Sequence, residues 1–284
     1  MALPVSAGAI RKLLAEVAAS GRHEDVLAVG GASELAPVLR QQLLRGRAEP
    51  GAVRLGDPED SDVYVHVLAG APSTEDVALL RRARHARVPA IAVAVGSTGD
   101  TAIPYVLATD VIRVGAGEAF PLDAIAHAIA ARLGEHGAPL AARVPLLREA
   151  VSEQLVASFA RRNGIVAAAV WIPGADLPVL ALNELRLVLR LAQAQGAARE
   201  VGDRLPELAA TLFAGFGLRA LARELLDLMP PTDTEGGRGS QRVAGWALKA
   251  VIAYGGTRAL GEAARRRFAL APTQQPGGVG RAWP

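Results

Sequence analysis

Histidine is the first residue type to consider in this sequence for metal binding or proton transfer. No two of them are three or four residues apart, the spacing that places two imidazoles on one face of a helix. The H-E-x-x-H pattern of zinc enzymes is also missing. The chain has no cysteine, which excludes thiolate ligands, disulfides and cysteine nucleophiles. We therefore expect neither a metal centre nor a cofactor. The histidines are His23, His66, His85, His127 and His136.

Other side chains with catalytic potential lack partners nearby in the sequence. No G-x-S-x-G sequence is present, and no base stands close to Ser33 or Ser97. Asp60 and Asp62 stand beside Glu59 before an apolar run, where we expect a solvated turn. These observations predict that the chain is not an enzyme.

Phosphate binding would require a glycine loop between a strand and a helix, followed by a lysine. After the first apolar run the chain reads G-G-A-S-E-L-A-P over residues 30–37, so the lysine of G-x-x-x-x-G-K-[ST] is missing. The only lysines are Lys12 and Lys249, and neither follows a glycine loop. Glu34 would place a carboxylate at the positive end of the next helix, where a phosphate would bind. We therefore favour an ordinary tight turn.

These residues lie among alternating strand and helix patterns in the first half of the chain. Short apolar runs bounded by turn residues predict strands, and stretches of helical spacing between them predict a parallel sheet covered on both faces. The strands are predicted at 26–29, 53–55, 63–68, 88–95 and 111–114. The helices are predicted at 33–46, 73–87, 103–109 and 121–134, with an earlier amphipathic helix at 3–20.

The strand patterns stop after Gly134, and long helices rich in alanine, leucine and arginine follow. These are predicted at 143–171, 176–198, 204–229 and 241–268. The fold class is thus α/β, a parallel sheet domain followed by an all-α helical bundle. We predict an N-terminal helix over 1–23, the sheet domain over 24–138, the helical domain over 139–270 and a disordered tail over 271–284.

The order and spacing of elements over residues 24–135 resemble a small Ras-like GTPase domain. That resemblance would place the D-x-x-G motif at residues 67–70, which read V-L-A-G and lack the aspartate that serves the magnesium ion. The guanine-reading [NT]-K-x-D would follow the fourth strand, where residues 96–100 read G-S-T-G-D without the lysine. The resemblance therefore implies a degenerate GTPase-like domain that has lost nucleotide binding.

Short motifs mark the helical half: WIPGADLP at 171–178, LNELR at 182–186 and YGGTR at 254–258. On these motifs, residues 143–268 resemble the YcjF-type family, bacterial domains of unknown function often fused to GTPase domains or found beside them. The resemblance implies association with GTPases and sometimes with membranes, but no established catalytic activity. The motif residues are Pro173, Gly174, Asp176, Asn183, Gly256, Thr257 and Arg258.

Glu184 is the residue of the helical half that most needs a partner. Helical spacing places it with Val188 and Leu191 on an apolar stripe, where an unpaired carboxylate would be costly to bury. Arg219 occupies the equivalent position in the next helix, so we predict that Glu184 and Arg219 form a buried pair. We favour a structural ion pair, and the alternative is a polar switch or ligand site. The alternates for the cation are Arg223 and Arg258. The opposite, polar side of the Glu184 helix carries Asn183, Arg186, Arg190 and Gln193.

Glycines inside the last two predicted helices indicate close helix approach, because glycine otherwise weakens a helix by about 1 kcal/mol. These helices are also apolar nearly all round, which predicts self-association or a protein partner, such as a GTPase, through about residues 204–268. A membrane surface is the second candidate for peripheral contact. The glycines are Gly215, Gly217, Gly245, Gly255, Gly256 and Gly261.

Composition narrows the remaining function classes. The net charge is only +3, from 31 basic and 28 acidic residues, and aromatic residues make up 4%, which argues against nucleic acid as a partner. No stretch offers about 20 uninterrupted apolar residues, and Arg11, Lys12 and Glu16 interrupt any signal-peptide core. We therefore predict a cytoplasmic, non-enzymatic pseudo-GTPase scaffold, with the inner face of the cell membrane as an associated location. The alternatives are a nucleotide-binding enzyme with a non-standard site and an integral membrane or membrane-remodelling factor.

Overall fold

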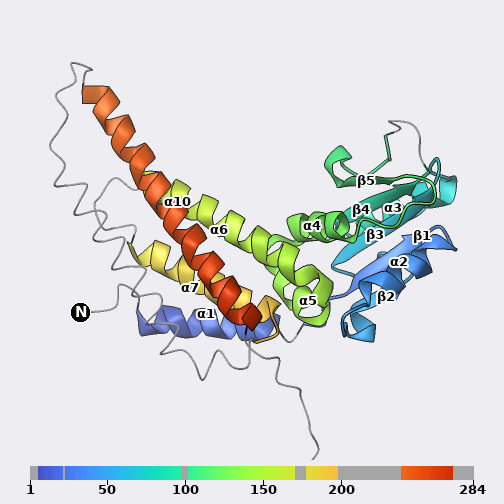
Figure 1. The fold of residues 1–284 in the computed structure, drawn as a ribbon, viewed down its shortest axis with the longest axis horizontal. Helices are drawn as coiled ribbons and strands as arrows, with labels where there is room; N and C mark the ends of the chain where they lie inside the picture. Colours follow the sequence, from blue (N-terminus) through green and yellow to red (C-terminus); the bar gives the residue numbers. More distant parts are fainter. Residues whose placement is uncertain (1–5, 22, 97–101, 170–176, 198–237, 271–284) are drawn as a thin grey trace, which may run out of the picture.

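A computed structural model describes residues 6–21, 23–96, 102–169, 177–197 and 238–270 of the chain. Within these residues, a parallel sheet with its covering helices is followed by long packed helices (Figure 1). The first helix, α1 (Ala7–Ser20), packs against these later helices. The fold class expected from the sequence, a parallel α/β sheet followed by a helical region, is confirmed.

The sheet has five strands in the order β2-β1-β3-β4-β5, and every neighbouring pair is parallel. This is one of the two common doubly wound orders, in which the winding direction reverses between β1 and β3. All five predicted strands are present, with ends shifted by at most two residues. They are β1 (Leu27–Gly31), β2 (Val53–Leu55), β3 (Val63–Ala69), β4 (Ala90–Val95) and β5 (Val111–Val114).

Successive residues of the central strands pack against helices on opposite faces of the sheet. Val65 and its neighbours on one face contact α2 (Leu35–Leu43) and α4 (Leu122–Leu133). Tyr64 and Leu68, on the other face, contact α3 (Thr74–His85). Burial on both faces explains why these strands read as nearly continuous apolar runs in the sequence.

The helical region comprises α5 (Gly137–Arg143), α6 (Arg148–Ala169), α7 (Leu177–Ala194) and α10 (Arg238–Leu270). In Figure 1, α10 runs along α6, and both also contact α7, whose other side is covered by α1. One cluster of buried side chains extends from Val65 in the sheet through Leu140 of α5 to Phe159 of α6 and Leu191 of α7. The predicted helix at 204–229 and the tail at 271–284 lie outside the described residues.

The predicted helix at 103–109 is wrong. The chain forms a turn there, and the only helical element is the short 3-10 segment η2 (Ala108–Asp110). Pro104 disfavours the helical conformation of the residue before it, and Tyr105 has a φ of +65°, which no right-handed helix accommodates. Among the helices described here, none is long and apolar enough to cross a membrane.

Candidate functional site

The turn between β1 and α2 stands where the resemblance to GTPases would place a phosphate-binding loop. It spans only residues 32–34, and the amide of Ala32 donates a 2.8 Å hydrogen bond to the carbonyl of Val67 in β3. Gly31 has a φ of +96°, and a Cβ built there would lie 2.1 Å from the same carbonyl oxygen. Glycine is required because two strands approach closely, and the Ala32 amide is not available to a phosphate.

A buried chain of polar side chains lies beneath this turn, between β3 and α3. The Nε2 atom of His66 lies 2.8 Å from an Asp76 carboxylate oxygen, and its Nδ1 atom lies 2.8 Å from the hydroxyl of Tyr64. Because an ionised carboxylate only accepts, His66 donates through Nε2, and Nδ1 accepts from Tyr64. The other Asp76 oxygen accepts from the amide and hydroxyl of Ser73, which caps α3.

The surroundings of Tyr64, His66 and Asp76 explain the protonation states of these three side chains. Burial lowers the pKa of His66, and the hydrogen bond to Asp76 offsets only part of that effect. Burial also raises the pKa of Tyr64. For Asp76, burial is outweighed by hydrogen bonds from Ser73 and His66, which lower the pKa of the carboxyl group. The result is a neutral imidazole between a phenol and a carboxylate. The side-chain polar atoms of Tyr64, His66 and Asp76 all have hydrogen-bond partners, and His66 is fully buried.

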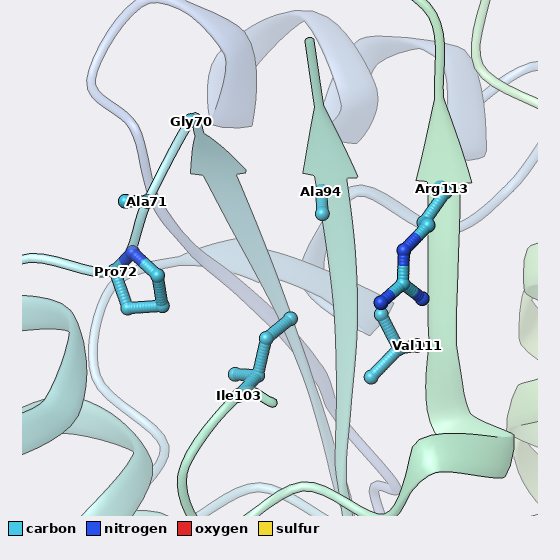
Figure 2. A pocket seen from close by; sticks show the side chains of 7 residues that line it. All are labelled: Gly70, Ala71, Pro72, Ala94, Ile103, Val111 and Arg113. Atoms are coloured by element: carbon cyan, nitrogen blue, oxygen red, sulfur yellow. The ribbon is translucent and has the colours of Figure 1, made fainter. Parts of the chain in front are cut away.

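The carboxyl ends of β3, β4 and β5 enclose a small cavity (Figure 2). Gly70, Ala71 and Pro72 line one side of it, and Arg113 points into it from β5. Its volume is about 10 Å³, which holds about one water molecule. Ligand sites usually measure roughly 300–1,000 Å³. This cavity by itself is therefore too small for a nucleotide; residues 97–101, which follow β4, lie outside the described part.

The helical region brings several of the sequence-predicted residues together in a polar centre between α6, α7 and α10. Asn183 of α7 donates to the side-chain oxygen of Asn163 in α6 at 2.8 Å, and Asn163 donates to the hydroxyl of Thr257 in α10 at 2.9 Å. The Thr257 hydroxyl in turn donates to the Glu184 carboxylate at 3.3 Å. Glu184 is 1% exposed, so the structure confirms that its carboxylate is buried.

The remaining predicted residues fall into two groups. Arg258 is exposed, and its guanidinium donates to the Tyr254 hydroxyl one turn earlier. Gly256 is half-buried on α10. The pair of Glu184 with Arg219 stays a prediction because the cation lies outside the described residues. The others that lie outside are Pro173, Gly174, Asp176 and Arg223.

The polar side of α7 is covered by α1. Arg186 donates to the Glu16 carboxylate at 2.6 Å, and Arg190 donates to the Ser20 hydroxyl at 2.6 Å. Gln193 accepts from Arg190 at 2.9 Å and also contacts the backbone of Val17. These contacts explain how Arg190 can be 4% exposed while charged.

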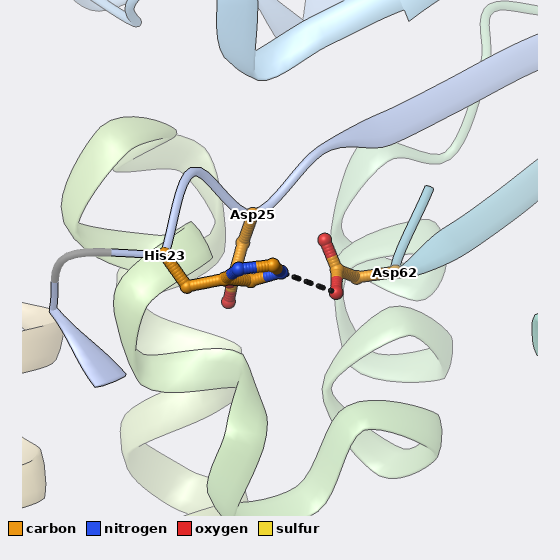
Figure 3. Close-up of side chains that lie close together, drawn as sticks. All are labelled: His23, Asp25 and Asp62. Carbon is orange, nitrogen blue, oxygen red and sulfur yellow. Dashed lines mark ion pairs between the residues drawn. The ribbon is translucent and has the colours of Figure 1, made fainter. Parts of the chain in front are cut away.

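A second group of titratable residues lies at the opposite, amino-terminal edge of the sheet (Figure 3). His23 and Asp25 precede β1, and Asp62 precedes β3. The Nε2 atom of His23 lies 3.8 Å from Asp25 Oδ1 and 3.6 Å from Asp62 Oδ1. Burial and the nearby Asp62 raise the pKa of Asp25 to about 6.

Sequence reasoning missed this cluster, although a signal for it exists. Asp62 was expected in a solvated turn, and the histidines were searched only for helical spacing. Parallel strands, however, bring their amino ends to one edge of a sheet, so polar residues just before β1 and β3 become neighbours once the two strands pair. His23 lies in a bend two residues before Asp25, and Figure 3 shows their side chains close together.

Comparison with known proteins finds no family model, no curated protein and no solved structure that matches this chain. What the structure supports is a parallel five-stranded α/β sheet followed by a helical region.

Proposed function

We propose that this protein is a non-catalytic pseudo-GTPase that acts as a binding or scaffold protein, with its helical half as the surface for protein association. The observation that most directly supports this proposal is the turn between β1 and α2, which we call the closed turn because its Ala32 amide is already hydrogen-bonded to Val67. Phosphate-binding loops use free backbone amides and a lysine. Here the Ala32 amide bonds Val67 instead, within a turn that spans only residues 32–34.

The surroundings of the turn also argue against a nucleotide. A Cβ built at Gly30 would lie 2.3 Å from the Tyr64 hydroxyl, so the buried Tyr64 side chain fills the space beside β1 at this point. Glu34 places a carboxylate at the start of α2, where a phosphate would need positive charge. The two lysines of the chain, Lys12 and Lys249, belong to α1 and α10.

The proposed partner is another protein, and the resemblance of residues 143–268 to YcjF-type domains favours a GTPase. Large apolar side chains are exposed on the helical half, including Ile165 of α6 and Val251 of α10, which are 63% and 65% exposed. These exposed side chains are the reason for placing the proposed association surface on the helical half. We place the protein in the cytoplasm. A membrane surface is the alternative to a protein as the binding partner of the helical half.

Calorimetric titration with GTP, GDP and ATP in the presence of Mg²⁺ tests the first half of the proposal. We expect no saturable binding up to about millimolar nucleotide. A dissociation constant of about 1 mM corresponds to only about 4 kcal/mol of binding free energy. Saturable binding at micromolar nucleotide would contradict the proposal and favour a nucleotide-binding enzyme with a non-standard site.

Association is tested by comparing Val251→Asp with Val38→Asp. Val38 is also exposed, at 43%, but it belongs to α2 on the sheet half, so it provides a matched control. We expect crosslinking of the chain to itself or to a co-expressed partner to be lost in Val251→Asp and retained in Val38→Asp. Flotation with liposomes that depends on Val251 would instead identify a membrane surface. Equal behaviour of both variants and wild type in every assay would contradict a binding role for this region.

A further inference from the structure

We infer that His23, Asp25 and Asp62 form a binding site for one divalent transition cation, of the zinc, cobalt or manganese class. The three ligand atoms, one imidazole nitrogen and two carboxylate oxygens, all lie within 4.8 Å of one another (Figure 3). The site is distinct from the closed turn and from the proposed association surface, so it does not depend on the proposed function.

The distances between the ligand atoms fit a cation better than direct hydrogen bonds. At 3.6 and 3.8 Å, the contacts of His23 Nε2 with Asp62 and Asp25 are too long for hydrogen bonds. Ligands about 2.1 Å from a tetrahedral metal lie about 3.4 Å apart, so small side-chain shifts would complete the coordination.

Asp25 provides an independent observation that points to a ligand at this position. Its side chain is only 9% exposed and its Oδ1 atom faces His23, yet no residue in the described part donates a hydrogen bond to its carboxylate. Among the described residues, the two arginines whose charges act on Asp25 are engaged elsewhere. Arg143 donates to the Asp25 backbone carbonyl and to Glu49, and Arg190 donates to Ser20 and Gln193. A charged carboxylate that is about nine-tenths buried and accepts no hydrogen bond from these residues is costly, and a coordinated cation would lower that cost.

The neighbouring backbone prepares the second carboxylate for coordination. The amide of Val26 donates to Asp62 Oδ2 at 2.8 Å, which leaves Oδ1 toward His23. Such outer hydrogen bonds orient the ligands in metal sites. The His23 side chain is 71% exposed, so a cation can enter from solvent, and water can fill the remaining coordination position.

The donor set selects the class of cation. Calcium takes six to eight oxygen ligands, and magnesium is usually held through carboxylates and water without imidazole. One imidazole with two carboxylates suits zinc, cobalt and manganese. Once bound, the cation would connect the segment that follows α1 to the first residues of β1 and β3, and would stabilise this edge of the sheet.

The test uses the metal-stripped full-length chain and titrates it with Zn²⁺, with Co²⁺ as a spectroscopic probe. We expect one equivalent to bind, to raise the melting temperature and to give the absorption of four- or five-coordinate Co²⁺. Asp25→Asn and His23→Gln should each weaken binding by more than about tenfold, because even outer ligand changes cost about 10–100-fold. His85→Gln removes an exposed histidine of α3 and should bind like wild type.

His23→Gln changes an exposed side chain and should fold normally even if Asp25→Asn does not, so the ligand set remains testable. The inference is overturned if the wild-type chain shows no saturable one-to-one binding. It is equally overturned if His23→Gln binds Zn²⁺ as tightly as His85→Gln and wild type do.

Discussion

The neutral state of His66 depends on its burial between Tyr64 and Asp76. Its lowered pKa means that the unfolded chain takes up the His66 proton at a higher pH than the native chain. The contribution of His66 to stability is therefore lost as the pH falls below about 6.5, the ordinary pKa of histidine. Asp76, whose pKa is also lowered, adds a loss of the same sign below about pH 4.

We predict that His66→Gln removes one loss of stability at falling pH, so that from pH 7 to pH 5 the change in its unfolding free energy is more favourable than in wild type. One fully exchanged proton would contribute at most about 1.4 kcal/mol per pH unit. At pH 7 the variant should be less stable by about 1–3 kcal/mol, because Tyr64 or Asp76 loses its buried partner. Urea unfolding at several pH values measures both effects.

The control for this measurement is His85→Gln, which removes an exposed histidine of α3 and should preserve the wild-type slope. The slope must be compared with wild type because other groups act in the opposite direction. His127, whose pKa is raised by Glu153, and Asp25, whose pKa is raised to about 6, both add stability as the pH falls. An unchanged slope in His66→Gln would show that His66 does not titrate in this window.

Helix α10 carries two glycines whose environments differ. A Cβ built at Gly261 would lie 2.6 Å from a methyl group of Val156 in α6 and 3.3 Å from Leu187 in α7. A Cβ at Gly255 would have no atom within 4 Å. The expectation of close helix approach is therefore confirmed at Gly261, while Gly255 faces open space.

We predict opposite signs for alanine at these two positions. Gly261→Ala should destabilise the protein by about 1–3 kcal/mol, because Val156 is β-branched and its methyl groups cannot move aside without strain. Gly255→Ala should stabilise it by up to about 1 kcal/mol through helix propensity alone. Chemical denaturation of both variants against wild type measures the difference. Equal changes at the two glycines would argue against the close contact of α10 with α6.

Strands and long helices could be predicted from the sequence because their signals are local. The runs at 63–68 and 111–114 are apolar except for His66 and Arg113, and each became a strand with almost the predicted bounds. The failure at 103–109 is also local, since Pro104 and the left-handed Tyr105 outweigh a weak helical pattern. Signals within one segment thus account for both the successes and this error.

Contacts between distant segments could not be read from the sequence. The position of Asp62 beside His23 follows only once β1 is known to pair with β3, because the two residues are far apart along the chain. The polar centre could be predicted in part, because helical spacing placed Glu184 on the buried side of α7. Its bond with Thr257 required the packing of α10, which is 73 residues away along the chain.

The sheet and the helical region share one set of buried side chains. Val65 of β3 belongs to the same apolar cluster as Leu140 of α5 and Leu191 of α7. By contrast, Leu13 of α1 belongs to a separate cluster formed with Leu185 and other residues of α7. A shared core couples the stability of the elements that line it, since a cavity on one side removes contacts from the other.

We therefore predict that the sheet and α5, α6 and α7 unfold as one cooperative unit. Val65→Ala should cost about 2–3 kcal/mol and reduce amide protection in α7 as strongly as in β3, because both would then exchange through the same global opening. Leu13→Ala should reduce protection in α1 while β3 keeps its own. Hydrogen exchange followed by mass spectrometry under native conditions measures both variants. If Val65→Ala left the protection of α7 unchanged, the shared cluster would not couple the two regions, and each would open independently.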